Sequence, residues 1–365
     1  MDKSTERRLL QTMVPVNALT QDHLETLLRD HDTETVIAGA PIFSRGDYDN
    51  RHVYLISGSV RLADASGNIS DIHADDELSR FPVAHQQPRQ HDATALSDCT
   101  IIRFNSDRFD GMLAWDQAAH YILLDVAANR EFDEDADWMM TLLQSNLFYK
   151  VPPMNIRKII DKFEPVYFSA GERVIRQGEV GDCCYLIKEG LVGVYVAEDE
   201  RGQSVQVNEL GVGRVFGEDA LVNDASRNAT IIMHTNGVLM RLSKRDFFVL
   251  LRHPEVKSLV LQDVATAFDG EPQWIDVRTQ DEFECGHYRG ALNMPLDLLK
   301  LKSRMLSTTQ PYIVYCNSGR RCEAAAYLLS EDGFNAVMLR GGIDGCAPQE
   351  RSLFQARELM VGSGQ

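Results

Sequence analysis

The sequence predicts a multidomain fold, in which two β-rich modules with flanking helices precede an α/β domain with a parallel sheet. Two observations predict it. Short apolar runs alternate with turn residues over 17–112 and again over 142–250, whereas from about residue 257 similar runs alternate with helical stretches. Strands that are separated by helices form parallel sheets. The length of 365 residues itself suggests two or three domains, since a domain holds roughly 150 residues.

The two β-rich segments are copies of one module. The run VYLISGSVRL (53–62) resembles CYLIKEGLVGVYV (184–196), and each follows a glycine-containing turn, at 46–50 and 178–182. Recurrence at a spacing of about 130 residues indicates a duplicated unit. We therefore expect three domains, over residues 1–130, 131–256 and 257–365.

Helical stretches flank both copies. Apolar residues at helical spacing predict an entry helix over 19–31 for the first copy and over 151–163 for the second. Between the copies, residues 115–144 are typical of two helices split by an acidic run at 131–137. The simplest interpretation of such a run is a solvated helix face or linker. A homodimer through these helices is a further expectation.

Composition excludes several functions. The net charge is −17, from 37 Lys+Arg against 54 Asp+Glu, so binding to nucleic acid or to an anionic membrane surface is disfavoured. No apolar run approaches the ~18 residues of a membrane span, and the first residues lack a secretory pattern. Seven cysteines, an odd number, fit a reducing cytoplasm. Their spacing predicts no metal site, and we expect a cytoplasmic protein.

The segment VFGEDALVNDASRNAT (215–230) carries the sharpest chemical signal. Gly217 lets the backbone approach a ligand closely, and the next residues can begin a short helix whose free N–H groups face an anion. An ionised Glu218 only accepts hydrogen bonds, which suits sugar hydroxyls. Nine residues later, Arg227 offers a planar set of donors for a phosphate.

This stretch resembles the phosphate-binding cassette of cyclic nucleotide-binding domains, with matches at Phe216, Gly217, Glu218, Ala220, Leu221, Arg227, Ala229 and Thr230. Over roughly 142–255 the resemblance implies a jelly-roll β-barrel, with Glu218 on the ribose hydroxyl and Arg227 on the cyclic phosphate. Asn228 can donate and accept, so it does not separate cAMP from cGMP. Similarity to bacterial members favours cAMP as the ligand. The alternative is an ordinary barrel turn with a surface arginine.

The first module departs from this pattern. Alignment of the two copies places His91 where Arg227 should be and Pro82 where Glu218 should be. Proline cannot accept a hydrogen bond from a ribose hydroxyl, and a neutral histidine clamps phosphate poorly. We therefore predict a degenerate copy that does not bind nucleotide and is retained for packing or dimerisation. Two cations nearby could partly compensate, namely Arg80 and Arg89.

The third domain carries a cysteine loop in YIVYCNSGRRCEAAAYLL (312–329). Cys316 ends an apolar strand just before a helix, and a helix N-terminus flanked by Arg320 and Arg321 lowers the pKa of such a thiol. The backbone N–H groups of CNSGRR can wrap into an anion-binding nest, with Gly319 supplying a positive φ.

Together with residues 274–295 and 334–343, this loop resembles the rhodanese family of sulfurtransferases. The resemblance implies that Cys316 attacks a sulfane sulfur and carries it as a persulfide. It further implies that the loop amides and Arg321 hold an anionic donor, with Arg320 assisting, and that a protein can accept the sulfur. Two other side chains keep two interpretations each. Cys322 either resolves the persulfide or is a small buried residue. His287 is either a structural hydrogen-bonding residue, the interpretation we favour, or a catalytic base.

Several functions remain open after these assignments. Four residues separate Cys316 from Arg321, whereas tyrosine-phosphatase-type loops need five, so the loop favours sulfur over phosphate. No basic recognition helix follows Arg252, which disfavours DNA binding. Three hypotheses remain: a cyclic-nucleotide-regulated sulfurtransferase, a non-enzymatic signalling adaptor that uses the rhodanese fold for docking, and a constitutive persulfide carrier whose modules set the oligomeric state.

Overall fold

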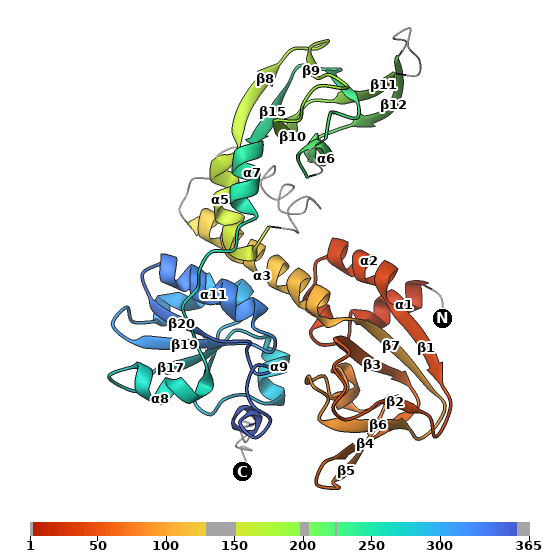
Figure 1. Cartoon of the computed structure of the whole chain (residues 1–365), viewed down its shortest axis with the longest axis vertical. Coiled ribbons are helices and arrows are strands. Elements are labelled where there is room, and N and C mark those ends of the chain that lie inside the picture. The colour runs from red at the N-terminus through yellow and green to blue at the C-terminus, as the bar shows by residue number, and fades with distance from the viewer. Residues whose placement is uncertain (1–2, 129–150, 198–203, 223–224, 356–365) are drawn as a thin grey trace, which may run out of the picture. The chain divides into compact units, whose positions relative to one another are not determined.

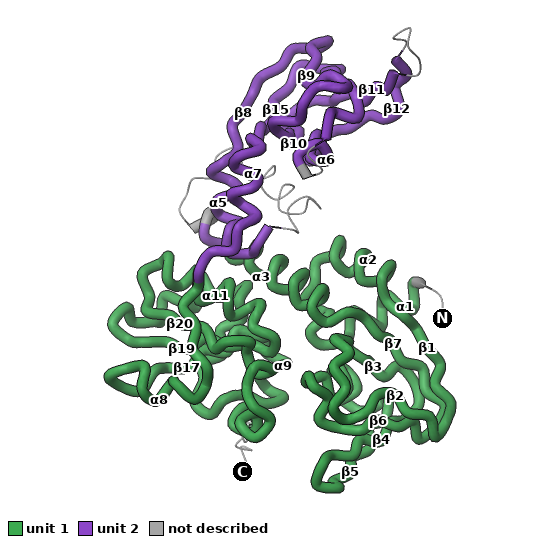
Figure 2. Tube along the Cα trace, viewed as in Figure 1, with its two compact units in different colours: residues 1–121, 256–365 green, residues 122–255 purple. Residues whose placement is uncertain are grey.

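A computed structural model describes residues 3–128, 151–197, 204–222 and 225–355. The chain forms two compact units, one comprising residues 1–121 with 256–365 and the other residues 122–255 (Figure 2). The first unit thus joins the first β-rich module to the C-terminal domain. The predicted acidic run at 131–137 and the helix expected after it lie outside the described residues.

The first module is a pair of antiparallel sheets, with strand orders β1-β7-β3 and β2-β6-β4-β5 (Figure 1). Its strands are β1 (Asp32–Val36), β2 (Pro41–Phe43), β3 (Arg51–Ser57), β4 (Ser59–Asp64), β5 (Ile69–His73), β6 (His91–Ala95) and β7 (Cys99–Asn105). Its helices are α1 (Lys3–Leu10), α2 (Gln21–Asp30) and α3 (Ser106–Ala128), with short 3-10 turns at Val16–Ala18 and Glu77–Arg80.

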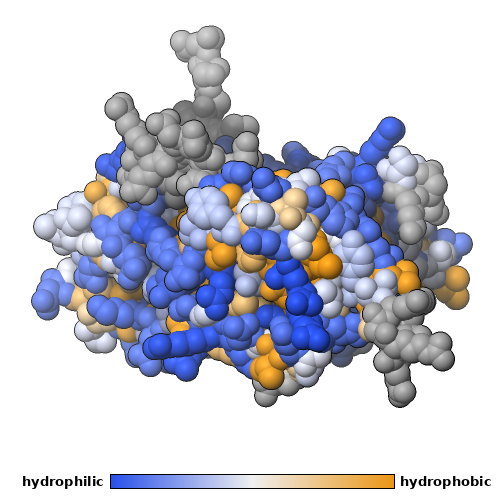
Figure 3. All heavy atoms as spheres, turned by 90° about the horizontal axis from the view of Figure 1, so that it is seen from above, coloured by the Kyte–Doolittle hydropathy of each residue, from blue (hydrophilic) through white to orange (hydrophobic). Residues whose placement is uncertain are grey.

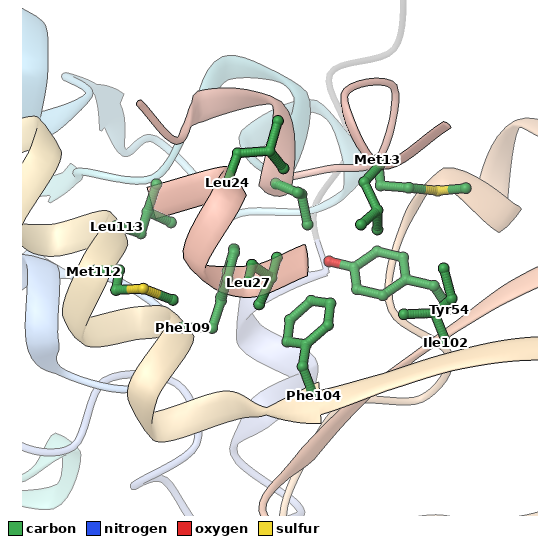
Figure 4. Packing of buried hydrophobic residues seen from close by; sticks show 11 residues of the cluster. Met13, Leu24, Leu27, Tyr54, Ile102, Phe104, Phe109, Met112 and Leu113 are labelled. Carbon is green, nitrogen blue, oxygen red and sulfur yellow. The ribbon is translucent and has the colours of Figure 1, made fainter. Parts of the chain in front are cut away.

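Helices and sheet of this module share one apolar core, shown in Figure 4. Leu24 and Leu27 of α2 pack with Tyr54 and Phe104 of the sheet, and the Tyr54 and Phe104 rings stack with centroids 5.5 Å apart. Phe109 and two neighbours on α3 join the same cluster. Burial of side chains of this size stabilises by about 1.5–3 kcal/mol each, so α3 is anchored firmly to the module.

The second module repeats this plan, with strand orders β13-β10-β15-β8 and β12-β11-β14-β9. Its strands are β8 (Glu164–Phe168), β9 (Arg173–Ile175), β10 (Cys183–Glu189), β11 (Val192–Ala197), β12 (Ser204–Leu210), β13 (Val215–Phe216), β14 (Thr230–Met233) and β15 (Gly237–Ser243). Its helices are a 3-10 turn at Pro153–Asn155, α5 (Ile156–Lys162), α6 (Glu218–Val222) and α7 (Lys244–Leu250). The entry helix lies within the predicted range.

The C-terminal domain is built on a parallel five-stranded sheet of order β16-β20-β19-β17-β18. The strands are β16 (Ser258–Leu259), β17 (Gln273–Asp276), β18 (Leu292–Asn293), β19 (Pro311–Tyr315) and β20 (Asn335–Leu339). The helices are α8 (Val264–Ala267), α9 (Gln280–Cys285), α10 (Leu299–Lys302) and α11 (Arg320–Glu331), with 3-10 turns at Leu261–Asp263, Leu296–Leu298, Ser303–Met305 and Arg351–Phe354.

The predicted fold class is confirmed, with two β-rich modules followed by an α/β domain. The face seen in Figure 3 is largely hydrophilic, with apolar residues in small groups, as the charged composition leads one to expect. In the part of the chain that the structure describes, no helix combines the length and apolar character needed to cross a bilayer.

Candidate functional site

The second module encloses a cavity of about 250 Å³ against its short helix α6. This is slightly below the ~300–1,000 Å³ of typical small-molecule sites, so the cavity suits a compact ligand. Glu218 and Arg227 both line it. The remaining lining residues are Ile175, Val194, Asn208, Leu210, Val215, Phe216, Gly217, Asp219, Ala220, Asn228, Ala229 and Ile231.

The Arg227 side chain is 6% exposed and is held in a fixed position beside the cavity. Its Nη1 donates to the Gly217 carbonyl oxygen at 2.8 Å, and its Nη2 donates to the Cys183 carbonyl oxygen at 2.7 Å. Nη2 also lies 3.2 Å from the Asp182 carboxylate, which is 70% exposed. Among the described residues these contacts engage only Nη1 and Nη2, so the Nε–H remains as a donor for an anion.

Gly217 and Glu218 complete this arrangement. Gly217 has φ +85°, and a Cβ atom there would lie 2.8 Å from Arg227 Nη1, so only glycine fits. Burial raises the pKa of the Glu218 carboxyl, and the neighbouring negative charge of Asp219 raises it further. The site therefore combines a partly desolvated hydrogen-bond acceptor with a fixed guanidinium.

The predicted ligand-binding residues are the motif residues from Phe216 to Ala229, with Asn228 included and Thr230 left out. Seven of these eight line the cavity: Phe216, Gly217, Glu218, Ala220, Arg227, Asn228 and Ala229. Leu221 is not among the lining residues and is fully buried. Each helical residue is turned by about 100° from the previous one, so Leu221 faces away when Ala220 faces the cavity. The prediction missed the lining residues on β9, β11 and β12, which are far from the motif along the chain.

In the first module, Arg89 and not His91 is the counterpart of Arg227. The Arg89 amide donates to the Asp47 carbonyl oxygen and its own carbonyl accepts from Gly46, with distances of 2.8 and 2.9 Å. Arg227 makes the same two bonds, at 2.8 and 2.9 Å, with the turn at 178–179. The expected alignment of His91 with Arg227 is therefore wrong by two residues, because it assumed an equal spacing in both copies.

Both Nη atoms of the Arg89 guanidinium make hydrogen bonds within the first module. Its Nη2 donates to both carboxylate oxygens of Asp49, at 2.9 and 3.0 Å, and to the Arg51 carbonyl oxygen at 2.6 Å. Its Nη1 donates to the carbonyl oxygen of Ala84 at 3.0 Å, and the group lies 4.1 Å from the centre of the Phe43 ring. Arg89 is 1% exposed. The two Nη atoms of Arg89 are thus engaged by the module itself, whereas the buried Nε has no hydrogen-bond partner among the described residues. That the first module does not bind nucleotide stays a prediction.

In the C-terminal domain, the Cys316 thiol lies inside a loop of backbone donors between β19 and α11. Its Sγ accepts hydrogen bonds from the amides of Gly319 at 3.2 Å and of Cys322 at 3.4 Å. Gly319 has φ +95° and stands at the N-cap position of α11. Burial acts to raise the pKa of Cys316, but the hydrogen bonds from Cys322 and the charge of Arg321 outweigh it, so the pKa is lowered.

Arg321 acts on this thiol through its charge and is paired with a carboxylate of the same domain. Its Nη1 and Nη2 donate to the two oxygens of Glu282, each at 2.7 Å, in a bidentate ion pair whose members are only 3% and 4% exposed. Burial alone would raise the pKa of Glu282, but Arg321 holds it at about 2. The structure thus gives Arg321 an ion pair within the domain, and its contact with an anionic donor stays a prediction. Arg320 is exposed at the start of α11.

Glu282 also anchors the loop itself. Asn317 Nδ2 donates to Glu282 Oε1 at 2.9 Å, and Arg278 Nη1 donates to Asn317 Oδ1 at 3.1 Å. Arg278 in turn forms a buried ion pair with Asp276 at 2.7 Å. This network fixes the cysteine loop from the side of β17 and α9, and the sequence prediction had assigned no role to it.

The remaining two candidates, Cys322 and His287, are both buried. Cys322 is fully buried, its Sγ lies 3.2 Å from the Gly319 carbonyl oxygen, and burial raises its pKa well above the usual value. A thiol with a raised pKa is a poor nucleophile, which favours the interpretation as a buried packing residue. His287 is 4% exposed, and its Nδ1 lies 2.9 Å from the Phe283 carbonyl oxygen.

Comparison with protein families identifies the domains that carry the two sites. The model for the cyclic nucleotide-binding domain matches residues 33–116 and 165–253, and the model for the rhodanese-like domain matches residues 261–347. The chain therefore contains two cyclic nucleotide-binding domains followed by a C-terminal rhodanese-like domain.

Individual relatives match part of the chain. A cAMP-dependent protein kinase regulatory subunit of Mucor circinelloides is 28% identical over 59% of this chain and 47% of its own length. The cGMP-dependent protein kinase 2 of Mus musculus is 22% identical over 76% of this chain and 35% of its own length. The chain thus spans about half of these relatives or less. The regulatory domain of Toxoplasma gondii PKA, solved with cAMP, is 20% identical, covers 68% of this chain and 92% of its own, and has a TM-score of 0.30.

Proposed function

We propose that this protein is a cAMP-regulated sulfurtransferase, in which the second module binds the nucleotide and the C-terminal domain forms a persulfide on Cys316. The observation that carries the proposal is that one chain contains both sites. The Cys316 thiol has a lowered pKa and accepts hydrogen bonds from backbone amides, and a separate cavity is lined by both Glu218 and Arg227.

The sensor half of the proposal rests on the chemistry of the cavity. Arg227 would contact the cyclic phosphate through its remaining donor, and Glu218 would accept from a ribose hydroxyl. Both residues lie on the same wall of a cavity that suits a compact ligand. Asn228 lines the cavity without distinguishing the bases, so cAMP is proposed over cGMP on the resemblance to bacterial members.

The enzymatic half of the proposal is a simple sulfur exchange. With thiosulfate as donor, the Cys316 thiolate attacks the outer sulfur, the new S–S bond forms as the old one breaks, and sulfite leaves with the electron pair. The product is a Cys316 persulfide anion, whose charge the amides of Gly319 and Cys322 are placed to stabilise. Cyanide then attacks the outer sulfur, releasing thiocyanate and restoring the thiolate.

The sensor is tested by replacing Arg227 with alanine. We expect the affinity for cAMP, measured by calorimetric titration, to fall about ten- to a hundredfold, because a charge-assisted hydrogen bond contributes roughly 1.5–3 kcal/mol. His91→Ala in the first module is the control and should leave the affinity unchanged. Since Arg227 also bonds to two backbone carbonyls, thermal unfolding must show that the variant is folded. Equal affinities of the Arg227 variant and the wild type would contradict the assignment.

Regulation is tested separately, by the rate of thiocyanate formation from thiosulfate and cyanide with and without cAMP. A ligand shifts an equilibrium only when it binds two conformations with different affinity. At a cAMP concentration that saturates the wild type but not the Arg227→Ala variant, we therefore expect the rate to change in the wild type and to stay nearly constant in the variant. An equal rate in wild-type protein with and without bound cAMP would remove the regulatory link and leave two independent functions.

The full burial of Cys316, at 0% exposure, favours a second candidate, a non-enzymatic adaptor that uses the rhodanese-like domain for docking. The two candidates differ in one measurable product. A sulfurtransferase gains the mass of one sulfur atom on Cys316 after incubation with thiosulfate, whereas an adaptor does not.

A further inference from the structure

The first module contacts the C-terminal domain directly, and both belong to the same compact unit. Arg351 Nη2 donates to the Gln87 carbonyl oxygen at 2.9 Å, and Arg80 Nη2 lies 3.3 Å from the Asp281 carboxylate. Residue 87 lies in the loop that leads to Arg89, the counterpart of the nucleotide-binding cassette. This loop is part of the contact surface with the C-terminal domain.

A third contact comes from α3, the long helix that follows the barrel of the first module. The Tyr121 hydroxyl donates to Asp332 Oδ2 at 2.6 Å, just beyond the end of α11. Earlier on α3, Asp110 lies close enough to Ser318 of the cysteine loop for the Ser318 side chain to contribute to lowering the Asp110 pKa. Four separate points of the first module thus contact the C-terminal domain, and one of them is two residues from Cys316.

The charge that Asp110 brings to this loop opposes the chemistry of Cys316. Asp110 is 8% exposed. Burial acts to raise its pKa, but His52 and the charge of Arg321 outweigh it and lower the pKa, so the group is a carboxylate. Its negative charge acts to raise the pKa of Cys316, and like charges repel, so it also disfavours an anionic sulfur donor. A residue that served the reaction would be expected to lower the pKa of Cys316 and to attract the anionic donor.

The contact between the two parts has the character of a separable interface. The contacts named above are hydrogen bonds and an ion pair, so the interface is polar. A cavity of about 500 Å³ also lies in it, lined by Tyr48, Gln87 and Pro88 of the first module and by residues of the C-terminal domain that include Leu261 and Cys346. Close-packed cores leave few voids larger than a water molecule, whereas polar, loosely fitted contacts are typical of domains that move relative to each other.

We propose that the first module is an inhibitory cover of the sulfurtransferase site, which closes the Cys316 loop through Asp110 and must separate from it before a sulfur donor can enter. The inference rests on the proposed sulfurtransferase function, and it gives the first, degenerate module a role other than nucleotide binding. The partner that covers the cysteine loop is the first module of the same chain, which places the buried Asp110 carboxylate beside this loop.

The test measures access to Cys316 without relying on turnover. Native full-length protein is treated with iodoacetamide at one fixed pH, and peptide mass spectrometry follows the alkylation of Cys316. Asp110→Asn removes the charge at constant size, and Tyr121→Phe removes a distant docking hydrogen bond while keeping the ring. We expect alkylation about three- to tenfold faster in each, the factor that one hydrogen bond contributes. Asp107→Asn, an exposed position on the same helix, is the matched control and should match the wild type.

The possible outcomes distinguish the proposed inhibitory role of the first module from the proposed sulfurtransferase activity. Alkylation at the wild-type rate or slower in both variants, with folded protein verified by thermal unfolding, overturns the cover. A loss of labelling and turnover in Asp110→Asn alone would make Asp110 a positioning residue for the loop and also overturn it. Faster labelling in both variants supports the cover even when no thiosulfate turnover is found, and in that case only the proposed sulfurtransferase activity fails.

Discussion

Replacement of Cys316 by serine is expected to abolish sulfur loading completely. The thiolate is the attacking group, and a serine hydroxyl in the same position cannot carry a persulfide. The measurement is the intact mass after incubation with thiosulfate, where the wild type gains one sulfur atom and the variant gains none. This is the largest effect that we predict, because the loop holds no second thiol with a lowered pKa among its described residues.

Cys322→Ser is the matched control for this experiment. Cys322 lies beside Cys316 on the first turn of α11, but burial raises its pKa, so it should not carry the sulfur. We expect Cys322→Ser to keep at least the first step, the gain of one sulfur atom. Loading of the Cys316→Ser variant, or its loss only in Cys322→Ser, would move the nucleophile to another cysteine.

The second large effect is on stability. Glu282→Gln leaves the Arg321 guanidinium buried without its counter-charge, and breaking a buried ion pair by removal of one partner costs about 3–5 kcal/mol. For a domain of this size, that lowers the midpoint of thermal unfolding by roughly 10 °C or more. Glu284→Gln, on the exposed side of the same helix α9, is the control and should change the midpoint by little.

The pH dependence of this loss gives an independent check. Arg321 lowers the pKa of Glu282 from 4.5 to about 2, so the ion pair stabilises the folded state fully above the unfolded pKa and is lost as the pH falls through the folded pKa. The difference in unfolding midpoint between wild type and Glu282→Gln should therefore be largest above pH 4.5 and shrink towards pH 2. A difference that stays constant over this range would mean that the charge of Glu282 is not what stabilises the domain.

Much of the fold and of the nucleotide cavity could be predicted, since the signals are local. Alternating apolar runs with turns define the modules, and Gly217, Glu218 and Arg227 lie within a stretch short enough for spacing to relate them. The same holds for Cys316 and Gly319. Residues that line the cavity from other strands, such as Asn208, could not be found in this way, because only strand pairing brings them to the motif.

The sequence by itself determined the three-domain architecture, the intact cassette of the second module and the cysteine loop of the third, because each is written in residues that are neighbours along the chain. Only the tertiary structure decided that Arg89 is the counterpart of Arg227, that Arg321 is paired with Glu282, and that Asp110 reaches the cysteine loop. The Arg321–Glu282 pair and the approach of Asp110 to the cysteine loop join residues that are many positions apart. A buried charge such as Arg321 needs a complementary partner, and the packing of whole elements decides which residue lies near enough to supply it.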